Sequence, residues 1–111
     1  EVWIMNYVTL GKTGLKAAVV SFGGIPIQRA DGANTKAVVD KLEEYGINYI
    51  DTARGYTVSE EYLGAALEGR RDKFILATKS MSRDAASMAA DVETSLRKLR
   101  RLRLRRRRSR S

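Results

Sequence analysis

Apolar and polar positions near the N-terminus form two short strand-like runs separated by a turn. Residues 7–10 and 15–18 are the two runs, and Gly11-Lys12-Thr13-Gly14 lies between them. A glycine-bounded stretch between two such runs is typical of a tight connection between antiparallel strands. The pattern therefore predicts a β-hairpin at the start of the chain.

Three further apolar runs then alternate with segments that repeat at helical spacing. The runs are residues 19–22, which end at Gly23-Gly24, residues 47–51 and residues 74–79. Their interiors are almost wholly apolar, as in strands that are covered on both faces. We therefore expect three buried strands after the hairpin.

Each predicted strand is followed by a predicted helix. The first begins near Asn34, a favourable cap residue, and ends at Gly46; the second is capped by Ser59 and ended by Gly69; the third begins near Asp84. The residues at helical spacing that form the apolar faces are Val38, Leu42 and Tyr45, then Leu63, Ala66 and Leu67, then Met88, Val92, Leu96 and Leu99.

The order of elements is thus a hairpin followed by three β/α units. Strands that alternate with helices in this way pair in parallel with right-handed crossovers. The pattern alone fits both a small open α/β sandwich and the opening part of a barrel. With 111 residues, the chain is much shorter than a whole (β/α)8 barrel of roughly 250 residues.

Cysteine and histidine are both absent from the sequence. A chain without them has no disulfide framework, no thiolate metal site and no imidazole base. No apolar run reaches the roughly 18 residues of a membrane span, and residues 1–5 lack the pattern of a signal peptide. We therefore expect a cytoplasmic protein with no metal site and no membrane contact.

The net charge of +8 is concentrated at the C-terminal end of the chain. All 13 acidic residues lie at or before Glu93, whereas 10 of the 21 Lys and Arg residues lie from Arg97 onward. Residues 1–96 thus carry 11 basic and 13 acidic groups, a net charge of −2. Any nucleic-acid binding suggested by charge therefore concerns only the tail.

Polar residues gather where the predicted strands end. Asp51 closes one strand, Lys79 closes the next, and Tyr56 lies in the loop after Asp51. Parallel strands end at one edge of a sheet, about 4.8 Å apart, where ligands bind in barrels and in open sheets. The sequence therefore predicts an ion pair between Asp51 and Lys79, with the Tyr56 hydroxyl directed at the same ammonium group.

This trio suits proton donation to a carbonyl oxygen. The pKa of tyrosine is about 10, and a nearby ammonium group lowers it by favouring the phenolate. Asp51 would keep Lys79 charged and oriented, so that Tyr56 could protonate a carbonyl oxygen while a hydride arrives at the carbon. The non-catalytic alternative is that Asp51 caps a loop, Lys79 is solvated and Tyr56 anchors the loop.

Several long motifs resemble those of the aldo-keto reductases. The main one is GINYIDTARGY at residues 46–56, with Ser59-Glu60-Glu61 and Leu63-Gly64 after it. The others, in the order of that family, are Leu10-Gly11-Lys12-Thr13-Gly14-Leu15, Gly69-Arg70-Arg71-Asp72-Lys73, Ala77-Thr78-Lys79 and Ser95-Leu96. The resemblance covers about residues 5–100, nearly all of the chain outside the tail.

The resemblance implies an α/β fold in which residues 1–100 form an incomplete TIM (β/α)8 barrel, made of the hairpin and three β/α units. It implies an oxidoreductase that reduces small aldehydes or ketones with NADPH, or alternatively NADH. The catalytic residues would be Asp51, Tyr56 and Lys79, with Tyr56 as proton donor. Gly23, Gly24 and Asp51 would be the residues that bind the nicotinamide cofactor.

Residues 23–29, together with Lys79-Ser80 and Arg83-Asp84-Ala85, resemble most closely one subgroup of the family. Full-length members of that subgroup carry a C-terminal iron-sulfur cluster. The cysteines of such a cluster would lie in sequence that this chain lacks, so the cluster would belong only to a full-length relative.

The chain departs from the family in two places. The family's fourth catalytic residue is a His at the end of the fourth strand, and this sequence contains no His. In place of that apolar strand, residues 101–111 form an arginine-rich tail, which we expect to be disordered or an out-of-frame extension of the third helix. Our hypothesis is a truncated or frame-shifted reductase, and we expect this chain alone to be inactive.

Two other functions stay open from the sequence. One is a non-catalytic fragment that associates with a second fragment to complete a barrel. The other is a protein that binds nucleic acid or an acidic surface through the tail. Arginine runs bind phosphate without sequence preference, and the tail has no aromatic residue on which bases could stack.

Overall fold

The computed structural model describes residues 4–100, so the predicted arginine-rich tail at residues 101–111 lies outside the described residues. The described part contains an antiparallel pair of strands followed by three strands that each precede an α-helix. No helix within it is long and apolar enough to span a lipid bilayer.

A three-stranded parallel sheet follows the hairpin, as predicted. It consists of β3 (Phe22–Gly23), β4 (Tyr49–Asp51) and β5 (Ile75–Ala77), in the order β3-β4-β5. In the register of the sheet, Gly23 lies opposite Asp51, and Asp51 lies opposite Ala77. The polar residues at the strand ends are therefore brought to one edge.

The predicted hairpin is also confirmed. Strands β1 (Tyr7–Thr9) and β2 (Lys16–Ala18) pair antiparallel. Gly11 and Gly14 in the connecting turn have φ angles of 52° and 75°, a left-handed region that glycine enters without a Cβ penalty.

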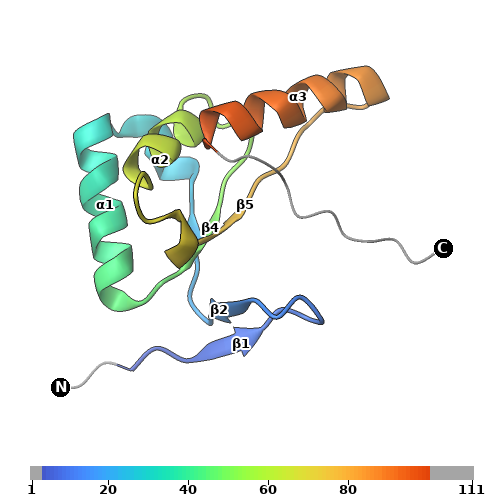
Figure 1. The fold of residues 1–111 in the computed structure, drawn as a ribbon. Coiled ribbons are helices and arrows are strands. Elements are labelled where there is room, and N and C mark those ends of the chain that lie inside the picture. The colour runs from blue at the N-terminus through green and yellow to red at the C-terminus, as the bar shows by residue number, and fades with distance from the viewer. Residues whose placement is uncertain (1–3, 101–111) are drawn as a thin grey trace.

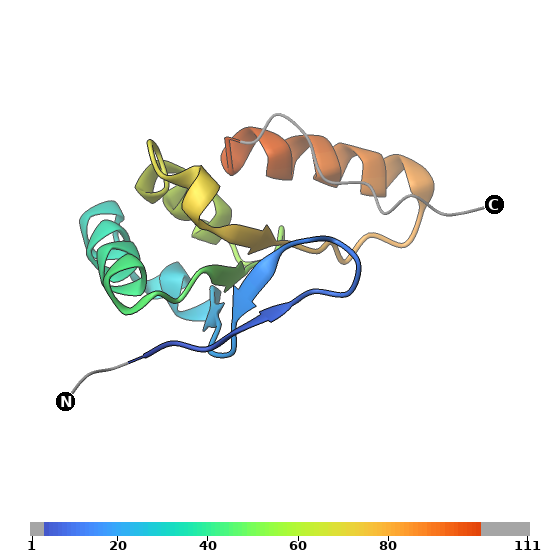
Figure 2. The same ribbon diagram turned by 60° about the horizontal axis from the view of Figure 1, so that its bottom comes forward.

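The hairpin lies at the end of the sheet where the parallel strands begin (Figures 1 and 2). The side-chain amide of Asn48 accepts the Ala18 N–H and donates to the Lys16 carbonyl, each at 2.8 Å. The Tyr7 hydroxyl donates to the Gly46 carbonyl oxygen at 2.8 Å. The opposite end of the sheet, where the predicted site residues lie, is left open by this arrangement.

The first strand of the sheet is shorter than the predicted strand over residues 19–22. Val19 and Val20 lie in a bend and are 57% and 46% exposed, so the expectation of a buried strand there is wrong. The Val19 N–H still bonds the Asn6 carbonyl at 2.9 Å on the hairpin side. The chain crosses from the hairpin to the sheet over these residues, so only Phe22 and Gly23 align with β4.

The three α-helices lie on the same side of the sheet (Figure 2). They are α1 (Gly32–Tyr45), α2 (Ser59–Ala66) and α3 (Ala85–Lys98). Two short 3-10 helices that the spacing does not predict, η1 (Ile25–Arg29) and η2 (Arg71–Lys73), connect β3 to α1 and α2 to β5.

The caps of α1 and α3 are aspartates. Helix α1 begins earlier than predicted because the Asp31 carboxylate, rather than Asn34, is the cap, and it accepts the Asn34 N–H at 2.7 Å. Gly46 ends this helix as predicted, with a φ angle of 73°. Helix α3 begins directly after Asp84, as predicted, and the Asp84 carboxylate caps it by accepting the Ser87 N–H at 2.8 Å.

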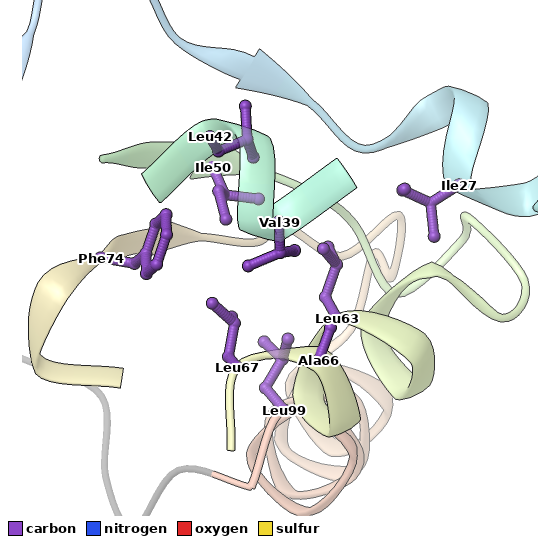
Figure 3. Packing of buried hydrophobic residues seen from close by; sticks show 9 residues of the cluster. All are labelled: Ile27, Val39, Leu42, Ile50, Leu63, Ala66, Leu67, Phe74 and Leu99. Carbon is purple, nitrogen blue, oxygen red and sulfur yellow. The ribbon is translucent and has the colours of Figure 1, made fainter. Parts of the chain in front are cut away.

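The hydrophobic core lies between the helices and the sheet (Figure 3). Its members come from η1, all three α-helices or their ends, β4 and the residue before β5, and are Ile27, Val39, Leu42, Ile50, Leu63, Ala66, Leu67, Phe74 and Leu99. Tyr45 and Met88, predicted on the apolar faces, are 49% and 38% exposed, so those two predictions are wrong. Met88 lies in the first turn of α3, and this end of α3 extends beyond α2 (Figure 1).

Candidate functional site

Asp51 and Lys79 form the predicted ion pair at the edge where the parallel strands end. The Lys79 Nζ donates to Asp51 Oδ2 at 2.9 Å and to the Thr52 carbonyl oxygen at 3.1 Å. The pair is possible because β4 and β5 are parallel neighbours. The Thr52 N–H continues the ladder beyond β4 with a 2.8 Å bond to the Ala77 carbonyl.

Tyr56 lies against the same ammonium group. The Lys79 Nζ is 4.9 Å from the centroid of the Tyr56 ring, within the range of a cation–π contact. The pKa of Lys79 is raised above its usual value, first by the hydrogen bond with Asp51 and second by the neighbouring Tyr56. Both neighbours therefore favour the charged form of Lys79.

The trio is open to solvent. The side chains of Lys79 and Asp51 are 49% and 47% exposed. Solvent screening at such exposure keeps the contribution of the pair to stability small. A molecule bound at this edge could therefore reach the ammonium group, the carboxylate and the phenol.

The two glycines at the end of β3 have different surroundings, and only Gly24 has no room for a side chain. Gly24 is buried, its N–H donates to the Asp51 carbonyl at 2.7 Å, and a Cβ there would come 2.8 Å from Ser59 Oγ and 3.0 Å from Thr52 Oγ1. Gly23 is exposed, and a Cβ there would have no atom within 4 Å. Gly24 thus lies inside the structure of the site, whereas Gly23 faces open space.

Ser59 belongs to this buried cluster of hydroxyl groups rather than to a helix cap. Its Oγ donates to the Gly24 carbonyl at 3.0 Å and lies 2.8 Å from Thr52 Oγ1. The N-cap of α2 is Val58, with no side-chain cap bond. The prediction of Ser59 as the cap is therefore wrong, because its hydroxyl joins the ends of β3 and β4.

A buried carboxylate that the sequence pattern does not reveal lies beneath the trio. Glu60 is fully buried and pairs with the Arg54 Nη1 at 2.5 Å and with the Thr78 Oγ1 at 2.8 Å. In the sequence Glu60 and Glu61 look alike, as acidic residues in the first turn of a helix. The signal that distinguishes them is Arg54, a cation in the loop before the helix.

The loop after Lys79 is fastened to α3 by Asp91. Its Oδ2 accepts the hydroxyl groups of Ser80 and Ser82, the latter at 2.6 Å. These two bonds, the Ser80 bond first, lower the pKa of Asp91 below its ordinary value. The clamp fixes the chain direction just after the residue that carries the ammonium group.

The arrangement of Tyr56 and Lys79 could act chemically as a proton donor beside a cation. Within residues 4–100 no cluster of three or more His, Cys, Asp or Glu side chains could hold a metal ion. A phenol next to an ammonium group can give its proton to an electron-rich oxygen, because the cation stabilises the charge that the proton leaves behind.

Known proteins with similar sequences include oxidoreductases and a channel subunit. A probable voltage-gated potassium channel subunit beta of Arabidopsis thaliana is 32% identical over 82 residues, which are 68% of this chain and 25% of that protein. L-galactose dehydrogenase of Arabidopsis thaliana is 42% identical over 79 residues, which are 63% of this chain and 25% of that protein. The chain spans about a quarter of the length of the curated relatives it matches.

Solved structures of similar fold point the same way. An aldo-keto reductase from Bacillus halodurans, in its holo form, matches with a TM-score of 0.77 and 31% identity over 88% of this chain and 37% of that chain. A Pseudomonas aeruginosa protein assigned to the same family matches with a TM-score of 0.78 and 29% identity over 88% of this chain and 43% of that one. The model of the Aldo/keto reductase family matches residues 19–104. The α/β fold, the sequence and the order of the motifs thus agree, and the chain belongs to the aldo/keto reductase family.

Proposed function

We propose that this chain supplies the Asp51, Tyr56 and Lys79 part of an NAD(P)H-dependent reductase that converts aldehydes or ketones into alcohols. The observation that carries the proposal is the contact of one ammonium group with both Asp51 and Tyr56 at the ligand-binding edge of a parallel sheet. Membership of the family supports it, because the family match over residues 19–104 includes all three residues.

Each residue of the trio has one role in this reaction. Tyr56 gives its phenol proton to the carbonyl oxygen of the substrate. Lys79 stabilises the negative charge that remains on the phenol oxygen, since its ammonium group lies against the ring. Asp51 holds Lys79 in place through the 2.9 Å bond and keeps it charged.

The residues at this edge fit a nicotinamide cofactor. Gly23 leaves open space beside Asp51, and Gly24 lets the end of β3 approach Asp51 closely. We propose that Gly23, Gly24 and Asp51 contact the nicotinamide of NADPH, with NADH as the alternative. When bound, the cofactor supplies the hydride that the carbonyl carbon receives.

The reacting unit that we propose is larger than this chain. We propose that the hairpin and the three β/α units are part of a TIM barrel whose other strands complete the substrate and cofactor sites. The length of the relatives supports this view, because the chain spans about a quarter of them.

An iron-sulfur cluster does not fit the residues of this chain. Such clusters are held by cysteine thiolates, and the sequence has no Cys. The resemblance to the iron-sulfur subgroup therefore remains a proposal about a full-length relative, and no step of the reaction involves a cluster here.

A chimera tests the proposed function. Residues 5–100 would replace the matching part of the Bacillus halodurans reductase, which has a similar fold. We expect NADPH oxidation that depends on a carbonyl substrate, and a loss of kcat of about 10²–10⁴-fold in Tyr56→Phe. Tyr45→Phe, at an exposed position on α1, is the matched control and should leave kcat unchanged. Equal rates for the two variants would contradict the assignment of Tyr56.

A further inference from the structure

The carboxylate of Glu60 joins two segments that carry the residues of the proposed site. Its Oε1 pairs with the Arg54 Nη1, and its Oε2 accepts the Thr78 hydroxyl. Arg54 lies two residues before Tyr56, and Thr78 lies directly before Lys79. One side chain is therefore bonded to both segments, with a separate oxygen for each.

Arg54 extends this connection around Tyr56. Its backbone N–H donates to the Lys79 carbonyl at 2.9 Å, and its Nη2 donates to the Thr57 carbonyl at 3.4 Å. The residue after Tyr56 and the residue that carries the ammonium group are thus both bonded to Arg54. Thr57 also has a φ angle of 44°, a left-handed conformation that is uncommon for a residue with a Cβ. The bonds of Arg54 therefore fix the backbone conformation of the loop at residues 54–57.

Stability alone is a poor explanation for this ion pair. The Glu60 side chain is fully buried and that of Arg54 is 17% exposed, so both charges are largely removed from water. The cost of taking charges out of water often exceeds the gain from pairing them, and apolar side chains of similar volume stabilise as well or better. An ion pair contributes geometric specificity instead, because each carboxylate oxygen fixes the position of one hydrogen-bond donor.

The helix dipole does not account for Glu60 either. Glu61, the neighbouring acidic residue in the first turn of α2, is exposed and can interact with the dipole without any desolvation. Glu60 instead points toward the loop and the end of β5, where its partners lie.

We propose that Glu60 is a positioning residue of the site, whose carboxylate holds the loop of Tyr56 and the strand end of Lys79 in one fixed arrangement. The inference rests on the proposed role of Asp51, Tyr56 and Lys79, and it adds a residue that touches neither substrate nor cofactor. Without Glu60 the ammonium group would keep Asp51, which lies on the adjacent strand, but lose its fixed position relative to the Tyr56 ring.

The test measures the coupling between Tyr56 and Lys79 in the full chain. The side chain of Lys79, labelled for NMR and assigned with Lys79→Arg, is titrated with pH in four proteins: the wild type, Tyr56→Phe, Glu60→Gln and the double variant. Asp51 and Tyr56 are the titratable groups next to Lys79, and both raise its pKa. Tyr56→Phe should therefore lower the Lys79 midpoint in the wild-type background.

Glu60→Gln should reduce that shift. An amide carries no charge, so the bond to the Arg54 guanidinium loses its ionic component, and an NH2 group facing Thr78 cannot accept the hydroxyl proton that Glu60 Oε2 accepts. A role in stability alone would lower the urea midpoint and leave the shift unchanged in the folded molecules. A full shift in the Glu60→Gln background would overturn the proposal for Glu60 and leave the trio intact. If Tyr56→Phe caused no shift in the wild-type background, the proposed interaction of Tyr56 with Lys79 would be wrong. The positioning role of Glu60 would then be wrong as well.

Two more variants keep the test decisive if Glu60→Gln does not fold. Thr78→Val removes only the hydroxyl that Glu60 Oε2 accepts and keeps the ion pair with Arg54. It should reduce the shift, and an undiminished shift would count against the proposal. Glu68→Gln is the matched control, because Glu68 pairs with Arg100 on the surface at 2.8 Å, and it should leave the shift unchanged.

Discussion

The carbonyl oxygen of Lys98 lies directly against Gly64, where a Cβ atom would come within 2.1 Å of it. The same Cβ would be 3.1 Å from the Leu99 Cα. Helices α2 and α3 can therefore pack together at this point only because residue 64 has no side chain. The contact also carries Leu99 into the hydrophobic core.

Gly64→Ala should destabilise the fold. The atoms in the way belong to the backbone of α3, which cannot move aside like the end of a flexible side chain, so the helices must separate. Overpacking of this kind costs about 1–3 kcal/mol in the free energy of unfolding. Urea denaturation followed by circular dichroism would measure the loss.

Gly32→Ala is the matched control for that substitution. Gly32 is the first residue of α1, and a Cβ there would have no atom within 4 Å. Alanine at a compatible position restricts the unfolded chain and stabilises by about 0.4–1 kcal/mol. If Gly64→Ala and Gly32→Ala changed the urea midpoint equally, close packing at Gly64 would not be the cause of the destabilisation.

Acid should weaken the ionic contacts between α1 and η2. Arg70 bonds Asp40 at 2.6 Å and Glu43 at 3.1 Å. The pKa of Asp40 is lowered mainly by Arg70 and that of Glu43 by Lys73 first and Arg70 second. Because both pKa values are lowered, this stabilisation is complete above the ordinary values of 3.8 and 4.5 and is lost as the pH falls through the folded values.

The measurement compares the urea midpoints of the wild type and Arg70→Gln from neutral pH downward. We expect a difference that is constant down to about pH 5 and then narrows as the two carboxylates are protonated. Lys12→Gln, an exposed change in the hairpin turn, is the control for the loss of a positive charge. A difference that stays constant into strong acid would show that these carboxylates do not contribute through Arg70.

The isolated chain should not reduce carbonyl compounds with NADPH. The resemblance to the family implies a His as the fourth catalytic residue, and the sequence contains none. The decrease of NADPH absorbance in the presence of an aldehyde would measure turnover. Oxidation that requires the protein and disappears in Tyr56→Phe would contradict this prediction and would indicate a self-sufficient enzyme.

The arginine-rich residues 101–111 should bind duplex DNA at low salt with little sequence preference. Seven of these eleven residues are Arg. Binding through about 6–10 phosphate contacts weakens by roughly 10³–10⁵-fold between 50 and 200 mM salt. Fluorescence anisotropy with two unrelated duplexes would measure the affinity, and removal of residues 101–111 should abolish it. Tight binding at high salt, or a preference for one duplex, would favour a specific nucleic-acid-binding function.

The sequence by itself determined the order of the elements and the edge at which the site lies. Apolar runs and glycines predict the hairpin and the parallel sheet because period and turn chemistry are local properties of the chain. The ion pair of Asp51 and Lys79 was predictable for a related reason. Neighbouring parallel strands lie about 4.8 Å apart, so a long side chain just beyond the end of one strand can reach the end of the next. Lys79, two residues after the end of β5, reaches Asp51 at the end of β4 in this way.

Only the tertiary structure decided how polar side chains are shared between segments. Ser59 and Glu60 resemble a cap and a dipole partner in the sequence, yet they bond Gly24 and Arg54 across the fold. Burial decides this, because a polar group removed from water must bond whichever partner the packing brings near. Val19 and Met88 are likewise exposed in the folded chain. Val19 lies where the chain crosses from the hairpin to the sheet, and Met88 lies at the end of α3 that extends beyond α2. Local spacing in the sequence encodes neither position.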